Sequence, residues 1–195
     1  MSPVPPVTLP PLRSHDDVAQ AISAGSYDAL LVVGPAPLSR HVAAGPLTEA
    51  LGRLERVDAT LTTERPTVVC AAVAGVPGER LVAATVGDWS TWEQDVRLYA
   101  LAAQAAAVRA FQAGARQPLL VVAAPADERF RRAVEVAVLG LLAAQWEPFE
   151  LRAGGERPPR ATAVGVVAPG VDLGRLQALG LAASWRATSP GPSPS

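Results

Sequence analysis

Short apolar segments alternate with longer amphipathic segments through the middle of the chain. Residues 81–86 and 118–124 are short and apolar, which is typical of buried strands. Residues 89–113 and 127–147 carry apolar side chains at intervals of three and four, which predicts helices. Because two strands joined by a long helix pair in parallel with a right-handed crossover, we expect a β-α-β-α unit with helices covering the sheet.

The first of these helices carries start and stop signals. Ser90 and Glu93 have the spacing of a capping box, in which each side chain accepts a hydrogen bond from the backbone amide of the other residue. Gly114 can adopt the left-handed backbone that ends a helix. One stripe of the helix is expected to face a core, and it consists of Trp92, Val96, Tyr99, Ala103, Ala106 and Ala110.

The second helix has comparable signals. Asp127 follows Pro125 and is expected to cap the helix, and Pro148 is expected to end it just past Trp146. Its buried stripe is predicted to be Phe130, Val134, Ala137, Leu141 and Ala144.

The flanking segments extend this pattern. We predict further strands at residues 27–34 and 161–168 and further helices at 16–24, 47–54 and 171–183. Residues 67–73 and 81–86 are expected to form a β-hairpin around the turn at 75–78. The predicted fold class is α/β, with three layers in which helices flank a mixed, mainly parallel sheet.

The chain has 195 residues, which suits one domain. We expect a disordered Pro-rich leader at 1–13, a single α/β domain at 14–186 and a disordered tail at 187–195. The leader lacks the basic start and apolar block of a signal peptide, and no apolar run approaches the roughly 20 residues that cross a bilayer. A cytoplasmic location without membrane contact is therefore expected.

Charge gives little indication of a binding partner. The formal net charge is −1, which offers no attraction to nucleic acid or to an anionic membrane. The densest basic cluster is Arg129, Arg131 and Arg132, which would suit a phosphate, but acidic residues interleave it. A solvated helix face is the favoured interpretation.

Residues that could carry chemistry are scattered. Cys70 lies in an apolar strand and is interpreted as a buried, inert thiol, and His15 and His41 are interpreted as lone surface histidines. The loop at 34–37 follows a strand but is rich in proline, so a plain turn is favoured over a phosphate-binding loop. Surface carboxylates are the default for Asp58, Glu64, Asp88 and Asp95, although folding could pair them. Trp92 is expected to be a core anchor and Trp89 a rim residue, although both could line a cleft.

The order of these elements resembles the N-terminal domain of the leucyl aminopeptidases, a family of two-metal exopeptidases. The resemblance covers residues 27–183 and is one of pattern. It rests on the strand Tyr-Asp-Ala-Leu-Leu-Val-Val-Gly at 27–34, the Leu-Thr-Glu-Ala-Leu helix at 47–51, the strand at 79–87, the Ala-rich helix that follows it, the strand at 119–122 and a helix ending in Gly140-Leu141-Leu142 near Trp146 and Phe149. It implies a macro-domain-like fold.

What the resemblance implies about function is mostly negative. The metal ligands, the catalytic arginine and both divalent metals of that family belong to a C-terminal domain that this sequence does not contain. We therefore expect no catalytic, cofactor-binding or metal-binding residue and no cofactor in this chain. The role that the resemblance implies is docking, oligomer assembly or regulation, with a second copy or an aminopeptidase catalytic domain as partner. Some bacterial members bind DNA, which the charge of this chain does not favour.

Two other interpretations remain open from the sequence. A macro-domain-like fold could bind ADP-ribose or a related nucleotide, which rests on fold analogy alone. The chain could also be a structural α/β domain without a ligand.

Overall fold

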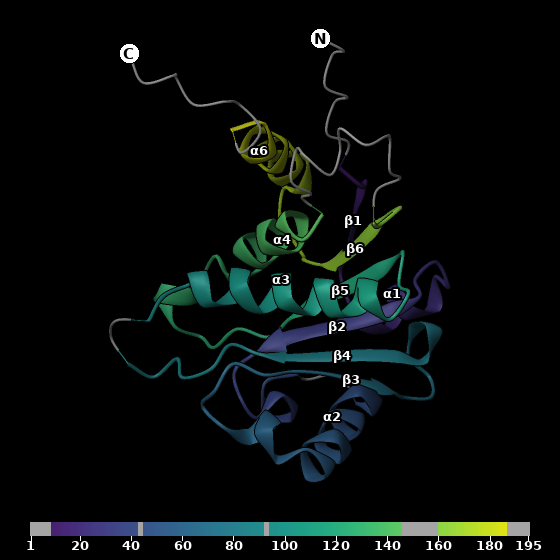
Figure 1. Cartoon of the computed structure of the whole chain (residues 1–195), viewed down its shortest axis with the longest axis vertical. Coiled ribbons are helices and arrows are strands. Elements are labelled where there is room, and N and C mark those ends of the chain that lie inside the picture. Colours follow the sequence, from purple (N-terminus) through teal and green to yellow (C-terminus); the bar gives the residue numbers. More distant parts are fainter. Residues whose placement is uncertain (1–8, 43–44, 92–93, 146–159, 187–195) are drawn as a thin grey trace.

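The chain folds around a six-stranded sheet in the order β1-β6-β5-β2-β4-β3 (Figure 1). The computed structural model describes residues 9–42, 45–91, 94–145 and 160–186, without the side chains of 182–186. Five strands run parallel, and β3 at one edge runs antiparallel to β4. The strands are β1 (Leu12–His15), β2 (Ala29–Gly34), β3 (Val68–Ala72), β4 (Arg80–Thr85), β5 (Pro118–Val122) and β6 (Val164–Val167).

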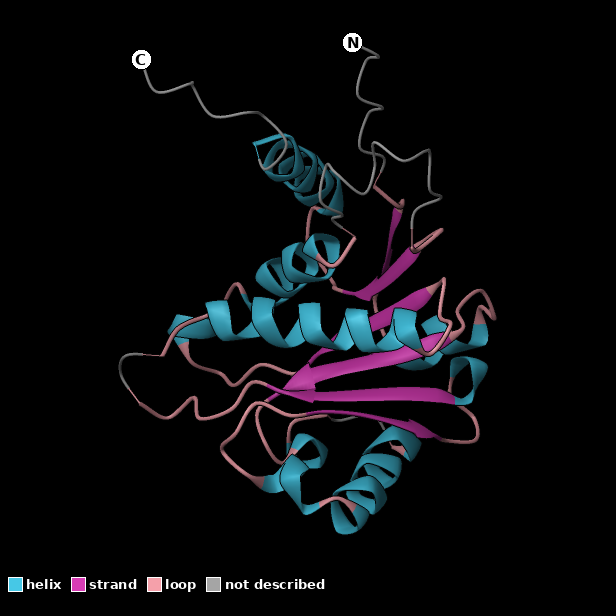
Figure 2. Cartoon of the chain, in the orientation of Figure 1, coloured by secondary structure: helices cyan, strands magenta, loops and turns pink. Residues whose placement is uncertain are grey.

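Helices lie on both faces of this sheet, as Figure 2 shows. The α-helices are α1 (Val18–Ser23), α2 (Pro46–Val57), α3 (Arg97–Gln112), α4 (Ala133–Ala143) and α6 (Leu173–Arg186). Single 3-10 turns are η1 (Leu38–Arg40), η2 (Ala59–Thr62), η3 (Pro77–Glu79) and η4 (Glu128–Phe130). The predicted three-layer α/β fold with a mainly parallel sheet is confirmed.

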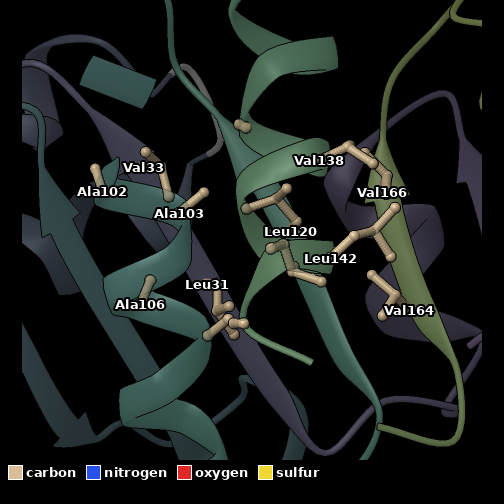
Figure 3. Packing of buried hydrophobic residues seen from close by; sticks show 14 of the residues in the cluster. Leu31, Val33, Ala102, Ala103, Ala106, Leu120, Val138, Leu142, Val164 and Val166 are labelled. Carbon is tan, nitrogen blue, oxygen red and sulfur yellow. The ribbon is translucent and has the colours of Figure 1, made fainter. Parts of the chain in front are cut away.

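Two apolar cores hold the layers together because the side chains of each strand alternate between the faces. On one face, Leu31, Val33 and Leu120 pack under α3 and α4 (Figure 3). On the other face, residues such as Leu30 and Val32 pack under α1, α2 and the first two 3-10 turns. Strand β2 is buried at every position, so the centre of the sheet is covered on both sides.

Two glycines let the helices of the α3 face approach closely. A Cβ atom on Gly140 would lie 2.2 Å from the carbonyl oxygen of Ala100, which is closer than atoms can pack, so α3 and α4 touch backbone to backbone. A Cβ atom on Gly180 would lie 2.9 Å from Cδ1 of Leu142, which brings α6 against α4. Helices α3, α4 and α6 therefore form a tightly packed layer.

The sequence placed two strands as neighbours that the structure separates. Strands β4 and β5 run parallel and are joined through α3, as predicted, but β2 lies between them and bonds to both. The pairing of parallel strands is set by contacts far apart in the sequence, and the local pattern does not contain it.

The first long helix begins later than its sequence signals indicate. Helix α3 starts at Arg97, well after Ser90, whose amide and hydroxyl both donate to the Asp88 carboxylate. This local turn competes with the predicted capping box. Trp92 and Glu93 lie outside the described residues. The end of the helix is confirmed, since Gly114 has a φ of +87°.

Other predicted elements agree more closely. Strands β3 and β4 form the predicted antiparallel hairpin. Asp127 caps as predicted, but it caps the 3-10 turn η4, and the α-helix begins only at Ala133. Helix α4 ends at Ala143, which is earlier than the predicted end at Pro148. Trp146, Pro148 and Phe149 lie outside the described residues.

The leader predicted at 1–13 extends too far along the chain. Leu12 and Arg13 belong to β1, which pairs with β6, and Leu9 is buried in the core of the α3 face. The edge strand Leu-Arg-Ser-His is short and polar, so it lacks the apolar alternation that marks a strand. Residues 1–8 and 187–195 lie outside the described part. Among the described residues, no helix is long and apolar enough to cross a membrane.

Candidate functional site

The place where an open α/β sheet binds ligands lies at the carboxyl end of β2. The segment after β2 leads to α2 on one face, whereas the segments after its neighbours β4 and β5 lead to α3 and α4 on the other face. Such a change of face opens a crevice at the carboxyl ends of the strands, where ligands bind in doubly wound folds. We therefore take the carboxyl ends of β2, β4 and β5 as the candidate site, and call them the carboxyl edge of the sheet.

The ends of β2 and β5 approach each other closely at this crevice. A Cβ atom on Gly34 would lie 2.8 Å from the carbonyl oxygen of Ala123 and 3.3 Å from Cδ2 of the buried Leu38. The amide of Ala123 donates to the carbonyl of Val33 at 2.8 Å. The predicted turn at 34–37 contains a cis peptide bond before Pro37, and its prolines have no amide hydrogen to offer an anion. The loop thus lacks the features of a phosphate cradle.

Aromatic rings bridge the same edge. Trp89, in the segment after β4, contacts His41 and Phe130 edge to face, with ring centroids 6.3 and 6.2 Å apart. Tyr99 lies against Phe130 at 5.8 Å and donates from its hydroxyl to the carbonyl of Ala123 at 3.0 Å. Trp89 is half-buried and packs on the core, so the predicted rim position is compatible with its surroundings.

Aspartates follow several strands at this edge, and each is engaged in local structure. Asp17 after β1 accepts from the amide of Gln20, Asp88 after β4 from that of Ser90, and Asp127 after β5 from that of Arg129. Hydrogen bonds from Ser90 lower the pKa of Asp88, and those from the Arg129 side chain and backbone lower the pKa of Asp127. Asp172 after β6 caps α6 in the same way. These carboxylates begin turns and helices.

The remaining candidate carboxylates are also separate from one another. Asp58 accepts from the amide and hydroxyl of Thr60, Asp95 pairs with Arg97, and Glu64 is exposed. Within the described part of the chain, no three of His, Cys, Asp and Glu lie close enough to hold a metal ion. The donor set of a two-metal aminopeptidase centre therefore does not fit these residues, and we derive no chemistry through such metals.

Both histidines have aromatic neighbours, which corrects their interpretation as lone surface residues. Nε2 of His15 lies within hydrogen-bonding distance of the Tyr27 hydroxyl, and the two rings meet edge to face. Burial raises the pKa of Tyr27, and the nearby Arg13 partly opposes this shift. Burial, followed by the charge of Arg40, lowers the pKa of His41, while Glu55 opposes the shift.

Sequence reasoning missed a buried acid beside this edge. Glu55 on α2 is 9% exposed, and its carboxylate accepts from the amide and the hydroxyl of Ser39, at 2.9 and 2.5 Å. The two bonds hold α2 against η1. Glu55 follows Leu51 by one helical turn, so its position on the buried face is the signal that could have identified it.

The surroundings of Cys70 and of the basic cluster at 129–132 indicate roles in the fold. Cys70 is free and half-buried in β3, less enclosed than expected. Arg129 pairs with Asp127, lies over the Phe130 ring at 5.1 Å and donates to the carbonyl of Thr91, so it joins the segments after β4 and β5. Arg131 pairs with Glu128 and Arg132 is exposed, as predicted for a solvated face.

A cavity lies at the opposite end of the sheet. It has a volume of about 490 Å³, and its lining includes Phe111, Ala115, Arg116 and Arg160. Ala115 and Arg116 precede β5, so the cavity lies at the amino ends of the strands and away from the switch point. Arg116 and Arg160 both have interaction partners.

The fold resembles part of a solved leucine aminopeptidase structure. A mutant of tomato leucine aminopeptidase superposes with a TM-score of 0.62 at 14% identity, covering 92% of this chain and 37% of that one. Two structures of the bottromycin maturation enzyme BotP, one in complex with Mn, match with TM-scores of 0.40 at 26% and 27% identity, covering 81% and 80% of this chain and 30% and 29% of theirs. No protein-family model and no curated protein matches the sequence. This chain therefore shares the fold of part of the tomato enzyme and spans about a third of its length.

Proposed function

We propose that this chain is a non-catalytic assembly module that associates with other protein subunits, either a second copy of itself or an aminopeptidase-type catalytic domain. The observation that carries the proposal is the close packing at the switch point, where Gly34 lies against Ala123 and Leu38. A ligand of nucleotide size needs an open crevice with amides directed into it, and neither the close approach of Gly34 to Ala123 nor the prolines at 35 and 37 favour such a crevice between these two strands.

The surface of the α3 face supports the assembly role. Leu101 on α3 is 65% exposed and Leu179 on α6 is 46% exposed. Between them, α4 is apolar at ten of its eleven positions, with Val136 and Leu139 only partly buried. A helix that is apolar on all sides is normally covered, and partner surfaces supply such cover in assemblies. The fold that the chain shares with part of a larger enzyme is compatible with a role beside another domain.

Two measurements on the purified full chain test the non-catalytic role. Hydrolysis of leucine p-nitroanilide with added Mn²⁺ or Zn²⁺ is expected to match the rate without protein, and turnover by the chain would contradict the proposal. Calorimetric titration with ADP-ribose is expected to give no heat of binding. Micromolar binding would favour the nucleotide-binding alternative instead.

A further inference from the structure

Strand β3 offers a row of backbone groups to a partner. The amide of Thr85 donates to the carbonyl of Thr67, and the amide of Val73 donates to that of Glu79, both at 2.9 Å. Because hydrogen bonding alternates along an antiparallel strand, the odd-numbered residues of β3 face β4. The amides and carbonyls of Val68, Cys70 and Ala72 therefore point away from the sheet. Within the described part of the chain, β4 is the one strand that pairs with β3.

This edge lacks the usual devices that prevent strands from pairing. Residues 66–78 include no charged side chain, and between Pro66 and Pro77 the strand carries valine, cysteine and alanine. Natural edge strands are normally protected by charges, by prolines within the strand or by shortness. The other edge, β1, has four residues and includes Arg13 and His15. The contrast identifies β3 as the edge suited to pairing.

We propose that β3 pairs antiparallel with β3 of a second copy of this chain, so that two sheets join into one across a twofold axis at Cys70. This inference rests on the proposed assembly function and names its partner and surface. In this register Val68 lies opposite the partner copy's Ala72, and all five residues of β3 are paired. The outward amides and carbonyls then satisfy each other in a self-complementary contact, as a twofold dimer requires. The uncharged stretch at 66–78 keeps like charges out of the contact.

The register places the two copies of Cys70 directly opposite each other. Opposed residues in a hydrogen-bonded antiparallel pair have Cα atoms about 5.5 Å apart, within the span of roughly 4.4 to 6.8 Å that a disulfide bridges. Cys70 is the chain's one cysteine, and its side chain is half-buried. Oxidation by copper–phenanthroline would remove one proton and one electron from each thiol and leave a disulfide between the copies.

Sedimentation velocity on the full chain is expected to show a dimer in the micromolar range. Copper–phenanthroline should convert this dimer into a species that survives a non-reducing gel. Cys70→Ser should sediment as the same dimer but form no cross-link. Ala72→Pro removes an outward amide and no bond to β4, so it should shift the chain to monomer and slow cross-linking about tenfold with Cys70 still present. Ala72→Ser is the matched control and should behave as the unmodified chain.

Each outcome decides the inference separately from the proposed function. A chain that stays monomeric overturns the inference, and so does a dimer that Ala72→Pro leaves intact and that oxidation does not cross-link. Neither result bears on hydrolysis or on ADP-ribose binding, which are measured in separate experiments. If Ala72→Pro does not fold, as circular dichroism would reveal, cross-linking of the unmodified chain through Cys70 still decides between the outcomes.

Discussion

The hydroxyl of Tyr99 donates a hydrogen bond to the carbonyl oxygen of Ala123, with a distance of 3.0 Å between the oxygen atoms. Tyr99 lies in the first turn of α3, and Ala123 follows β5. The bond is buried and joins a helix to the segment that packs against Gly34. The Tyr99 side chain therefore fixes the main chain at Ala123, at the carboxyl end of β5.

Tyrosine ionisation is expected to weaken the fold at alkaline pH. Burial raises the pKa of Tyr99 and of Tyr27 above the ordinary value of 10.0, so both stay protonated in the folded chain where the unfolded chain releases protons. Their contribution to stability is complete below pH 10.0 and falls as the pH rises above it. Urea unfolding at pH values from about 9 to about 11 should show, above pH 10.0, a loss of up to roughly 1.4 kcal/mol per pH unit from Tyr99, and Tyr27 should add to the loss in the same direction. Tyr99→Phe should reduce this slope, and an unchanged slope would contradict the assignment.

Gly140→Ala is expected to destabilise the chain because α3 and α4 touch at this point. The added Cβ atom would lie 2.2 Å from the carbonyl oxygen of Ala100, and the two helices must separate. We expect a loss of about 1 to 3 kcal/mol in the free energy of unfolding, measured in urea. Gly174→Ala on α6 is the control, since its nearest atom is 3.4 Å away, and should be neutral or stabilising by up to about 1 kcal/mol. Equal effects at both positions would contradict the close approach.

Leu141→Ala is expected to open a cavity between α4 and the sheet. Leu141 is fully buried in the core of the α3 face, so the loss should be about 2 to 5 kcal/mol in chemical denaturation. Leu101→Ala makes the same chemical change at a position that is 65% exposed and should alter stability by less than about 0.5 kcal/mol. A small effect at Leu141 would show that its core is loosely packed.

Asp28→Ala should loosen the amino ends of the central strands. The Asp28 carboxylate accepts from the amides of Arg116 and Gln117, at 2.7 and 2.9 Å, and so ties the start of β2 to the start of β5. Hydrogen bonds to a charged group contribute about 1.5 to 3 kcal/mol, and we expect a loss in that range. Hydrogen exchange at these two amides should accelerate. Asp28→Asn keeps one acceptor and should lose less, so a larger loss for Asn than for Ala would contradict the role.

Local patterns predicted the elements of this fold well, and long-range pairing poorly. The strand at 27–34, the hairpin of β3 and β4 and the glycine at position 114 follow from alternation, turn residues and backbone freedom, which act within a few residues. The insertion of β2 between β4 and β5 and the pairing of the polar strand at Leu12 depend on partners far away in the sequence.

At the candidate site, too, local features were predictable from the sequence and long-range contacts were not. The proline-rich turn after Gly34 was recognisable from its residues, whereas the contact of Gly34 with Ala123 and the burial of Glu55 required the folded chain. The assignment of Ser90 failed because Asp88, two residues earlier, supplies a competing acceptor. Asp and Ser side chains form such local turns readily, so a cap motif beside another acceptor is weak evidence for a helix start.

The pairing of β1 with β6 has a consequence for synthesis of the chain. Leu12 and Val164 are partners, although about 150 residues separate them. At translation rates of about 5 to 20 residues per second, β1 emerges from the ribosome many seconds before β6, the one strand that pairs with it among the described residues. Once β5 has emerged, the flank that β6 will cover also stays open until β6 follows, so both β1 and β5 are exposed to wrong pairing during synthesis.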